Sequence, residues 1–266
     1  MPRFLEKVWG STQLSPWFPD SEKKIGEAWL GGPEGEPLAI LIKFLFTTEP
    51  LSVQVHPNDE YAWKHHKSRG KTEMWYILRA EPGAQIALGL KEAMTADELR
   101  AACESGSIVQ KLNWIDAHPG DTFLTPAGTI HAIGAGLALC EIQQQSDVTY
   151  RLYDYGRPRE LHLDQGIAVS HLDAFRATPQ PAGCLADCPY FRTERLALSE
   201  DTLLAPFPNQ LSWLICVDGE GAIDGDPYRA GQGWNLIAGV TPVRIHPSRP
   251  SVFLKTFVPA QAQPLS

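Results

Sequence analysis

Short apolar or alternating runs, separated by turn residues, are the feature that most limits the fold of this sequence. Glycine and proline each occur 22 times and interrupt the chain at short intervals. The strand-like runs between them include residues 38–46, 51–56, 73–78, 122–124, 137–143 and 149–153. Such runs with Gly/Pro turns are typical of β-sandwiches and barrels, whereas βαβ units would need longer helices between the strands. The pattern therefore predicts a mainly β fold.

Helical patterns are few, and the β-rich sequence divides into two parts. Residues 95–103 form the clearest helix, because Thr95 and Glu98 have the spacing of a capping box. A second short helix is expected near residues 59–67. The proline- and glycine-containing stretch 177–183 indicates a linker. We therefore expect two β-rich units, at residues 1–176 and 184–258.

Composition excludes several classes of function. The net charge of −8, from 31 acidic and 23 basic residues, argues against a nucleic-acid partner. No apolar run approaches the roughly 20 residues of a membrane span. The first residues carry charges where a signal peptide would be apolar. The five scattered cysteines fit reduced thiols. We expect a soluble, cytoplasmic protein with neither nucleic-acid nor membrane partners.

The most specific motif ends at His131. Residues 120–131 have the pattern G-x5-P-x-G-x2-H, in which Gly120 begins a strand, and Pro126 and Gly128 form a tight turn at its end. This pattern resembles the second motif of cupin β-barrels. In a cupin, the histidine meets metal ligands from an earlier motif at the barrel mouth.

The earlier motif would supply Gln54, His56 and Glu73. Gln54 and His56 are two residues apart in a strand-like run, so their side chains point to the same face. Glu73 opens the next apolar run. Imidazole and carboxylate ligands suit a divalent metal such as zinc, whereas a glutamine ligand is less usual. We therefore predict one metal ion, bound by these three residues and His131.

Longer stretches extend the resemblance to a family. The matching residues are 6–10, 51–59, 70–76, 126–131 and 141–157. They resemble the short bacterial form of the type I phosphomannose isomerases (mannose-6-phosphate isomerases), which belong to the cupin superfamily. The resemblance covers about residues 1–175. It implies that the first unit is a catalytic, cupin-like jelly-roll barrel. Together with the template match of the second unit, described below, we expect two cupin-like jelly-roll barrels with a few short helices.

The resemblance also implies an activity and a set of site residues. The activity is the zinc-dependent interconversion of mannose 6-phosphate and fructose 6-phosphate through an enediolate, with one zinc ion per chain. The zinc ligands map onto the four residues named above. The catalytic arginine maps onto Arg151, and an acidic and a lysine position map onto Asp147 and Lys71. Larger members have a histidine where this chain has Gly70, so a proton-transfer role for that histidine cannot apply here.

The sequence leaves the roles of these residues open. The reaction needs a group that polarises the sugar oxygens, a base for the carbon-bound proton, and a clamp for the phosphate. Arg151 can stabilise enediolate charge or bind phosphate. Lys71 can bind phosphate or transfer protons, and Asp147 can act as the base or orient its neighbours. Tyr153 is two residues from Arg151 in a strand, so we expect it to line the substrate site with Arg151 and Lys71.

The second unit is predicted to lack a metal. When the cupin template is placed on it, Gly231, Ile237 and Gly239 take the turn positions, and Pro242 falls where the histidine should be. Proline has no ligating side chain. The unit would then be a cupin-like barrel that covers one side of the first.

Other functions remain open at this point. His56, Glu73 and His131 alone would satisfy the two-histidine, one-carboxylate triad of iron oxygenases. Another cupin metalloenzyme, such as a dioxygenase or an epimerase, is therefore an alternative. Gly70 keeps a third possibility open, a non-catalytic sugar-phosphate-binding protein. We expect a monomer or a weak homo-oligomer whose partner is a small phosphosugar.

Overall fold

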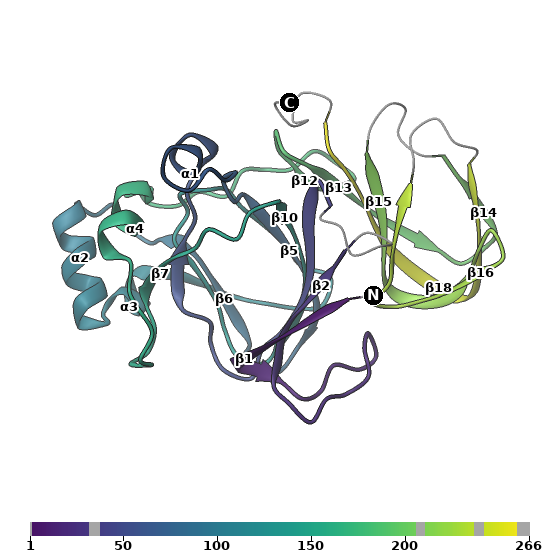
Figure 1. Cartoon of the computed structure of the whole chain (residues 1–266), viewed down its shortest axis with the longest axis horizontal. Coiled ribbons are helices and arrows are strands. Elements are labelled where there is room, and N and C mark those ends of the chain that lie inside the picture. Colours follow the sequence, from purple (N-terminus) through teal and green to yellow (C-terminus); the bar gives the residue numbers. More distant parts are fainter. Residues whose placement is uncertain (1, 32–37, 206–210, 237–241, 260–266) are drawn as a thin grey trace.

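The computed structural model describes residues 2–31, 38–205, 211–236 and 242–259 of the 266-residue chain (Figure 1). Its described residues form three antiparallel sheets and four helices. The prediction of a mainly β, cupin-like fold with a few short helices is confirmed. No helix in these ranges has the length and apolar character needed to cross a membrane.

Two sheets face one another in the N-terminal part of the chain. The order of the first is β1 (Arg3–Ser11), β2 (Ile25–Leu30), β3 (Ile40–Phe46), β10 (Leu137–Gln144), β5 (Glu73–Ala80) and β8 (Thr122–Thr125). The order of the second is β11 (Tyr150–Tyr153), β4 (Val53–Val55), β9 (His131–Ile133), β6 (Gln85–Leu90) and β7 (Leu112–Asp116). One apolar cluster joins their inner faces, with Trp75 and Leu139 from the first sheet and Ile86 and Ile133 from the second.

Helices cover the outer face of the second sheet (Figure 1). They are α1 (Asp59–His66), α2 (Ala96–Ser105), α3 (Ile108–Lys111) and α4 (Leu163–Val169). The predicted capping box is present, since the Thr95 hydroxyl accepts from Glu98 N and the Glu98 carboxylate accepts from Thr95 N. Leu99 packs in the same cluster as Val53 and Val55 of β4. Because strand side chains alternate, the side chain of Gln54, between these two valines, points to the inner face of the sheet.

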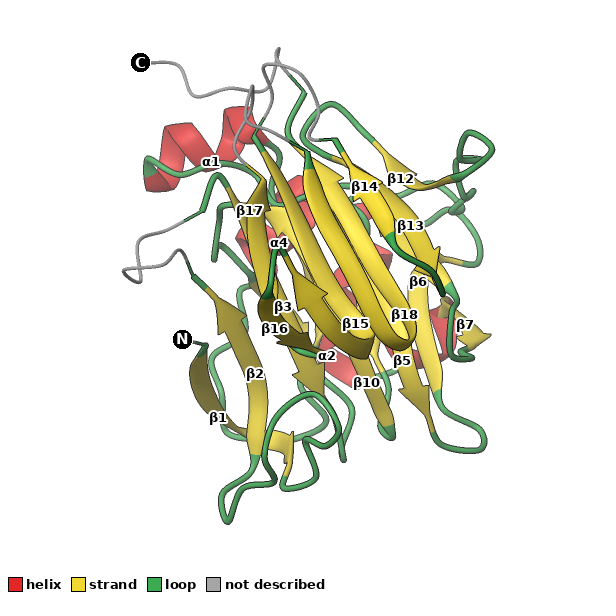
Figure 2. Cartoon of the chain, turned by 90° about the vertical axis from the view of Figure 1, so that its right-hand side faces the viewer, coloured by secondary structure: helices red, strands yellow, loops and turns green. Residues whose placement is uncertain are grey.

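A third sheet covers the outer face of the first (Figures 1 and 2). Its order is β12 (Cys184–Asp187), β13 (Arg192–Leu198), β18 (Val243–Phe257), β15 (Ser212–Ile223) and β16 (Asp226–Arg229), with β14 (Thr202–Leu204) on β18 and β17 (Gly233–Leu236) on β15. Large apolar side chains such as Phe44 and Phe253 share one core across this boundary. Trp17 Nε1 also donates to Val217 O at 2.7 Å. The third sheet and the first sheet therefore share a continuous hydrophobic core.

The C-terminal unit is made of strands, as the sequence predicts for its described residues. Its described strands belong to the third sheet. Of the positions used in the cupin template, Ile237 and Gly239 lie outside the described residues, whereas Gly231 and Pro242 are described. The closure of this unit into a second barrel, and the boundaries 1–176 and 184–258, stay predictions.

Candidate metal centre and adjoining pocket

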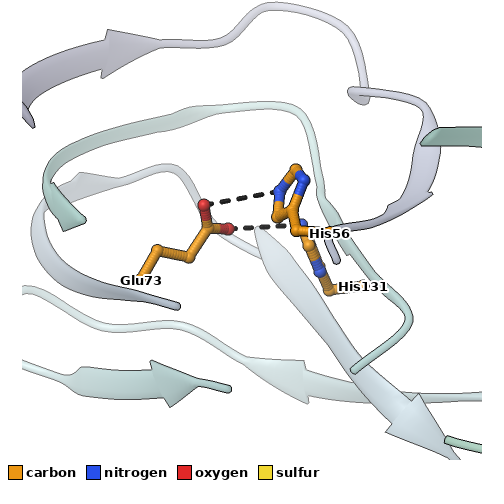
Figure 3. Close-up of side chains that lie close together, drawn as sticks. All are labelled: His56, Glu73 and His131. Carbon is orange, nitrogen blue, oxygen red and sulfur yellow. Dashed lines mark ion pairs between the residues drawn. The ribbon is translucent and has the colours of Figure 1, made fainter. Parts of the chain in front are cut away.

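Three predicted ligands meet between the two N-terminal sheets. His56 follows β4, Glu73 begins β5 and His131 begins β9. One ligand atom from each lies within 4.8 Å of the others. The three side chains are at most 1% exposed. Figure 3 shows the two rings beside the carboxylate, with His56 Nε2 at 3.4 Å from Glu73 Oε2 and His131 Nε2 at 3.2 Å from Glu73 Oε1.

Backbone carbonyls set the tautomer of both histidines. His56 Nδ1 lies 3.0 Å from Val148 O, and His131 Nδ1 lies 2.9 Å from Thr129 O. A carbonyl oxygen only accepts, so we assign the ring proton to Nδ1 in each case. Burial, with Lys71 second, lowers the pKa of His56 to about 3, and burial also lowers the pKa of His131. The two neutral rings therefore direct Nε2 lone pairs at Glu73.

This donor set fits a divalent cation. Two nitrogen lone pairs face a carboxylate, an arrangement that is unfavourable without a positive charge. The Lys71 ammonium lies 3.0 Å from His56 Nε2 and 3.1 Å from Glu73 Oε2, but His131 Nε2 and Glu73 Oε1 still face each other at 3.2 Å. Both Glu73 oxygens and His131 Nε2 are buried and make no well-aligned hydrogen bond. Burial raises the pKa of Glu73, but its charged surroundings, with Lys71 the largest contributor, outweigh burial and hold this pKa well below its usual range. A neutral His–His pair with an ionised carboxylate suits zinc and related metals.

Gln54 lies beside this cluster on the same sheet. Its Cα is the register partner of His131 on β9 and of Arg151 on β11. Its neighbours Val53 and Val55 are fully buried on the helical side. Gln54 instead lines a pocket next to the cluster. Its position suits the fourth ligand, which stays a prediction.

The pocket has a volume of about 280 Å³ and is lined largely by charged side chains. It is lined by Lys7, Trp9, Glu27, Lys43, Leu45, Leu51, Ser52, Gln54, Lys71, Glu141, Asp147, Thr149, Arg151 and Arg159. Lys71 connects the pocket with the cluster, because its Nζ lies 3.0 Å from His56 Nε2 and 3.1 Å from Glu73 Oε2. A small polar molecule in this pocket would therefore lie next to the metal centre.

The structure brings Arg151 and Asp147 to this pocket, but not Tyr153. Arg151 lies on β11 and donates from Nη1 to Glu160 O at 2.7 Å. Asp147 is exposed and comes from the loop before β11. A register shift between Arg151 and Tyr153 breaks the alternation that would place both on one face. Tyr153 packs instead against α2, where a Cβ added at Gly106 would lie 2.8 Å from its hydroxyl.

Sequence reasoning missed a buried ion-pair group in the lining. Lys43 Nζ lies 3.1 Å from Glu141 Oε1 and 3.9 Å from Glu27 Oε2. Burial alone would lower the pKa of Lys43, but Glu141 and Glu27 outweigh burial and raise it. Glu141 also accepts from Trp75 Nε1 at 3.2 Å. One signal could have revealed the pair, because Lys43 is the single charge in an otherwise apolar strand and Glu141 is the single charge in a buried one.

The glycine at position 70 is required by close packing. A Cβ at Gly70 would lie 2.6 Å from the backbone of Asn58 and Asp59, where α1 begins. Its own N–H donates to Asp59 Oδ1 at 2.7 Å. A histidine side chain at this position would require the start of α1 to move.

Comparisons with known proteins agree with the sequence resemblance. No protein-family model matches the chain. The mannose-6-phosphate isomerase ManA of Bacillus subtilis is 34% identical over an alignment of 294 positions, gaps included, that covers 90% of this chain and 92% of ManA. The mannose-6-phosphate isomerase of Streptococcus mutans is 43% identical over 145 residues, covering 52% of this chain and 46% of that protein. The crystal structure of a Bacillus subtilis mannose 6-phosphate isomerase superposes with a TM-score of 0.84 at 26% identity, covering 96% of this chain and 98% of that one.

Proposed function

The chain belongs to the mannose-6-phosphate isomerase family, and we propose that it interconverts mannose 6-phosphate and fructose 6-phosphate in a zinc-dependent reaction through an enediolate. The observation that carries the proposal is the buried cluster of His56, Glu73 and His131 beside a pocket lined by Lys71 and Arg151. The same three ligands would suit an iron oxygenase, but the cationic pocket favours a phosphorylated substrate.

Gln54, His56, Glu73 and His131 would hold one zinc ion per chain. When bound, the ion supplies a Lewis acid that polarises the sugar oxygens. The two carbonyl contacts fix the histidine rings, so the ligands are oriented before the metal binds. Pro57 O, which accepts from Lys71 N at 3.0 Å, helps to hold Lys71 at the edge of the cluster.

The pocket residues have distinct proposed roles. A proton leaves C2 of the open-chain aldose and one is added at C1, while the hydroxyl proton passes from O2 to O1, so the substrate loses no electrons. Asp147 is our candidate for the base at carbon, since among the described residues it makes no ion pair. Lys71 would move the proton between the oxygens, and the permanently charged Arg151 would stabilise the enediolate.

The cellular setting follows from the substrate. A phosphosugar is a small-molecule partner of the cytoplasm, and we propose that location for the protein. None of the five cysteines, all of which are described, forms a disulfide, which agrees with a reducing compartment. We propose a monomer or a weak homo-oligomer.

The direct test supplies purified protein with zinc and mannose 6-phosphate and detects fructose 6-phosphate by a coupled assay. We expect steady turnover in proportion to the metal bound. An absence of turnover in protein that carries one metal ion per chain would refute the proposed activity and favour a binding protein.

A further inference from the structure

The pocket is lined by five basic side chains that differ in how fully carboxylates neutralise them. At the end near β1 to β3, Lys7 Nζ lies 3.1 Å from Glu27 Oε1. Lys43 Nζ lies 3.1 Å from Glu141 Oε1. A phosphate group that approached either lysine would also meet these carboxylates. This end of the pocket is therefore poorly suited to a dianion.

The end near β11 has a different charge distribution. Among the described residues, no carboxylate lies within ion-pair distance of Arg151, and its buried Nε has no hydrogen-bond partner. Burial, followed by the neighbouring Arg159, lowers the pKa of Arg151 and outweighs the opposing effect of Asp154. One exposed carboxylate, Asp147, shares the lining. Even so, this end keeps an excess of positive charge, because Arg151 has no ion pair among the described residues and Arg157 and Arg159 divide one buried carboxylate, Asp154, between them.

A buried carboxylate fixes one of these guanidinium groups. Asp154 is 2% exposed and accepts from Arg159 Nε at 2.5 Å and from Arg159 Nη2 at 2.6 Å. This bidentate pair occupies one edge of the planar group, and Arg159 Nη1 has no hydrogen-bond partner among the described residues. The same carboxylate holds Arg157, which turns toward Pro50 O and does not line the pocket. Arg159 thus presents a fixed hydrogen-bonding edge to the pocket.

We propose that Arg159, positioned by Asp154, binds the phosphate group of the substrate and leaves Arg151 to act at the sugar carbons. This inference rests on the proposed function and specifies the substrate as a phosphate monoester. Arg159 and Arg151 line the same pocket as Gln54, the predicted fourth metal ligand, so one substrate molecule can meet the metal centre and both guanidinium groups.

The test compares zinc-loaded wild-type protein with the Arg159→Gln variant. We expect the KM for mannose 6-phosphate and the inhibition constant of inorganic phosphate to rise by about 10- to 100-fold, with kcat changed less than about threefold. Asp154→Asn should raise the KM and the phosphate inhibition constant by a smaller factor, because Arg159 remains but loses the carboxylate that orients it. Arg157→Gln is the matched control, because Arg157 shares Asp154 but lies outside the pocket, and it should leave both constants close to wild type.

Direct titration with inorganic phosphate separates this inference from the proposed activity. The wild-type protein should bind phosphate, and Arg159→Gln should bind it about 10- to 100-fold more weakly, whether or not the protein turns over mannose 6-phosphate. Equal phosphate affinity in the two proteins would overturn the inference. So would an Arg159→Gln variant that loses kcat while keeping KM, because Arg159 would then act at the reacting carbons.

Discussion

Replacement of Arg151 by alanine tests the pocket chemistry with little risk to the fold. The side chain makes one described hydrogen bond, from Nη1 to Glu160 O, and no ion pair. Loss of one such bond costs about 1 kcal/mol of stability. Arg151 makes no hydrogen bond or ion pair with the three clustered ligands, and the strand that carries Gln54 separates it from His131. The variant should therefore fold and keep its metal.

We expect Arg151→Ala to lower kcat. If Arg151 stabilises charge that develops on the enediolate, its removal should cost about as much as removal of an oxyanion-hole donor, roughly 3–4 kcal/mol or 10²- to 10³-fold in kcat. Arg151→Lys keeps the charge but lacks the planar fork, so it should recover part of this loss.

The assay measures kcat and KM for mannose 6-phosphate together with metal content per chain. Arg244→Ala, at an exposed arginine of β18, is the control and should match wild type in all three. If Arg151→Ala loses its metal, the residue supports the metal centre and the assigned role is wrong. If kcat stays within a few-fold of wild type, the residue does not stabilise the transition state.

Further predictions concern stability. Lys43→Met should lower the free energy of unfolding by about 3–5 kcal/mol in urea titrations, because it leaves Glu141 buried without its partner; an unchanged free energy would contradict this. Gly70→Ala should lower the free energy of unfolding by about 1–3 kcal/mol, because the added Cβ would clash with the start of α1. A variant as stable as wild type would show that the start of α1 can move at no cost. Burial raises the pKa of Glu27, but Lys43 and Lys7 outweigh burial and hold it below 4.5, so the stability that Glu27 contributes is present above pH 4.5 and is lost as the pH falls through the lowered value. Glu27→Gln should accordingly weaken the acid dependence of unfolding measured below pH 4.5, and an identical dependence in both proteins would contradict the assignment.

The sequence predicts the architecture well where local signals are strong. All six of the quoted apolar runs contain strands, and the Thr95–Glu98 capping box starts α2. His56 and Glu73 could be placed because strand alternation and the order of the runs are enough to bring them to one face. His131 could be placed because Pro126 and Gly128 set the turn before it.

Other features depend on contacts that no local pattern contains. Tyr153 lies outside the pocket because a bulge in β11 reverses the alternation of side chains between the two faces, and a single sequence gives no sign of the bulge. Lys43 and Glu141 become site residues only when β3 and β10 pair in register and place Lys43 opposite Glu141. Arg159 lies in a loop, and its orientation depends on Asp154, five residues earlier.

The most direct test of the central claim measures turnover of mannose 6-phosphate as a function of the metal bound per chain. The account predicts that chelator-treated protein has no isomerase activity, and that activity returns linearly up to one zinc ion per chain. Glu73→Gln, which removes the only carboxylate of the cluster among the described residues, should lose both the metal and the activity. Full turnover of mannose 6-phosphate by metal-free protein, or by a Glu73→Gln variant that binds no metal, would contradict it.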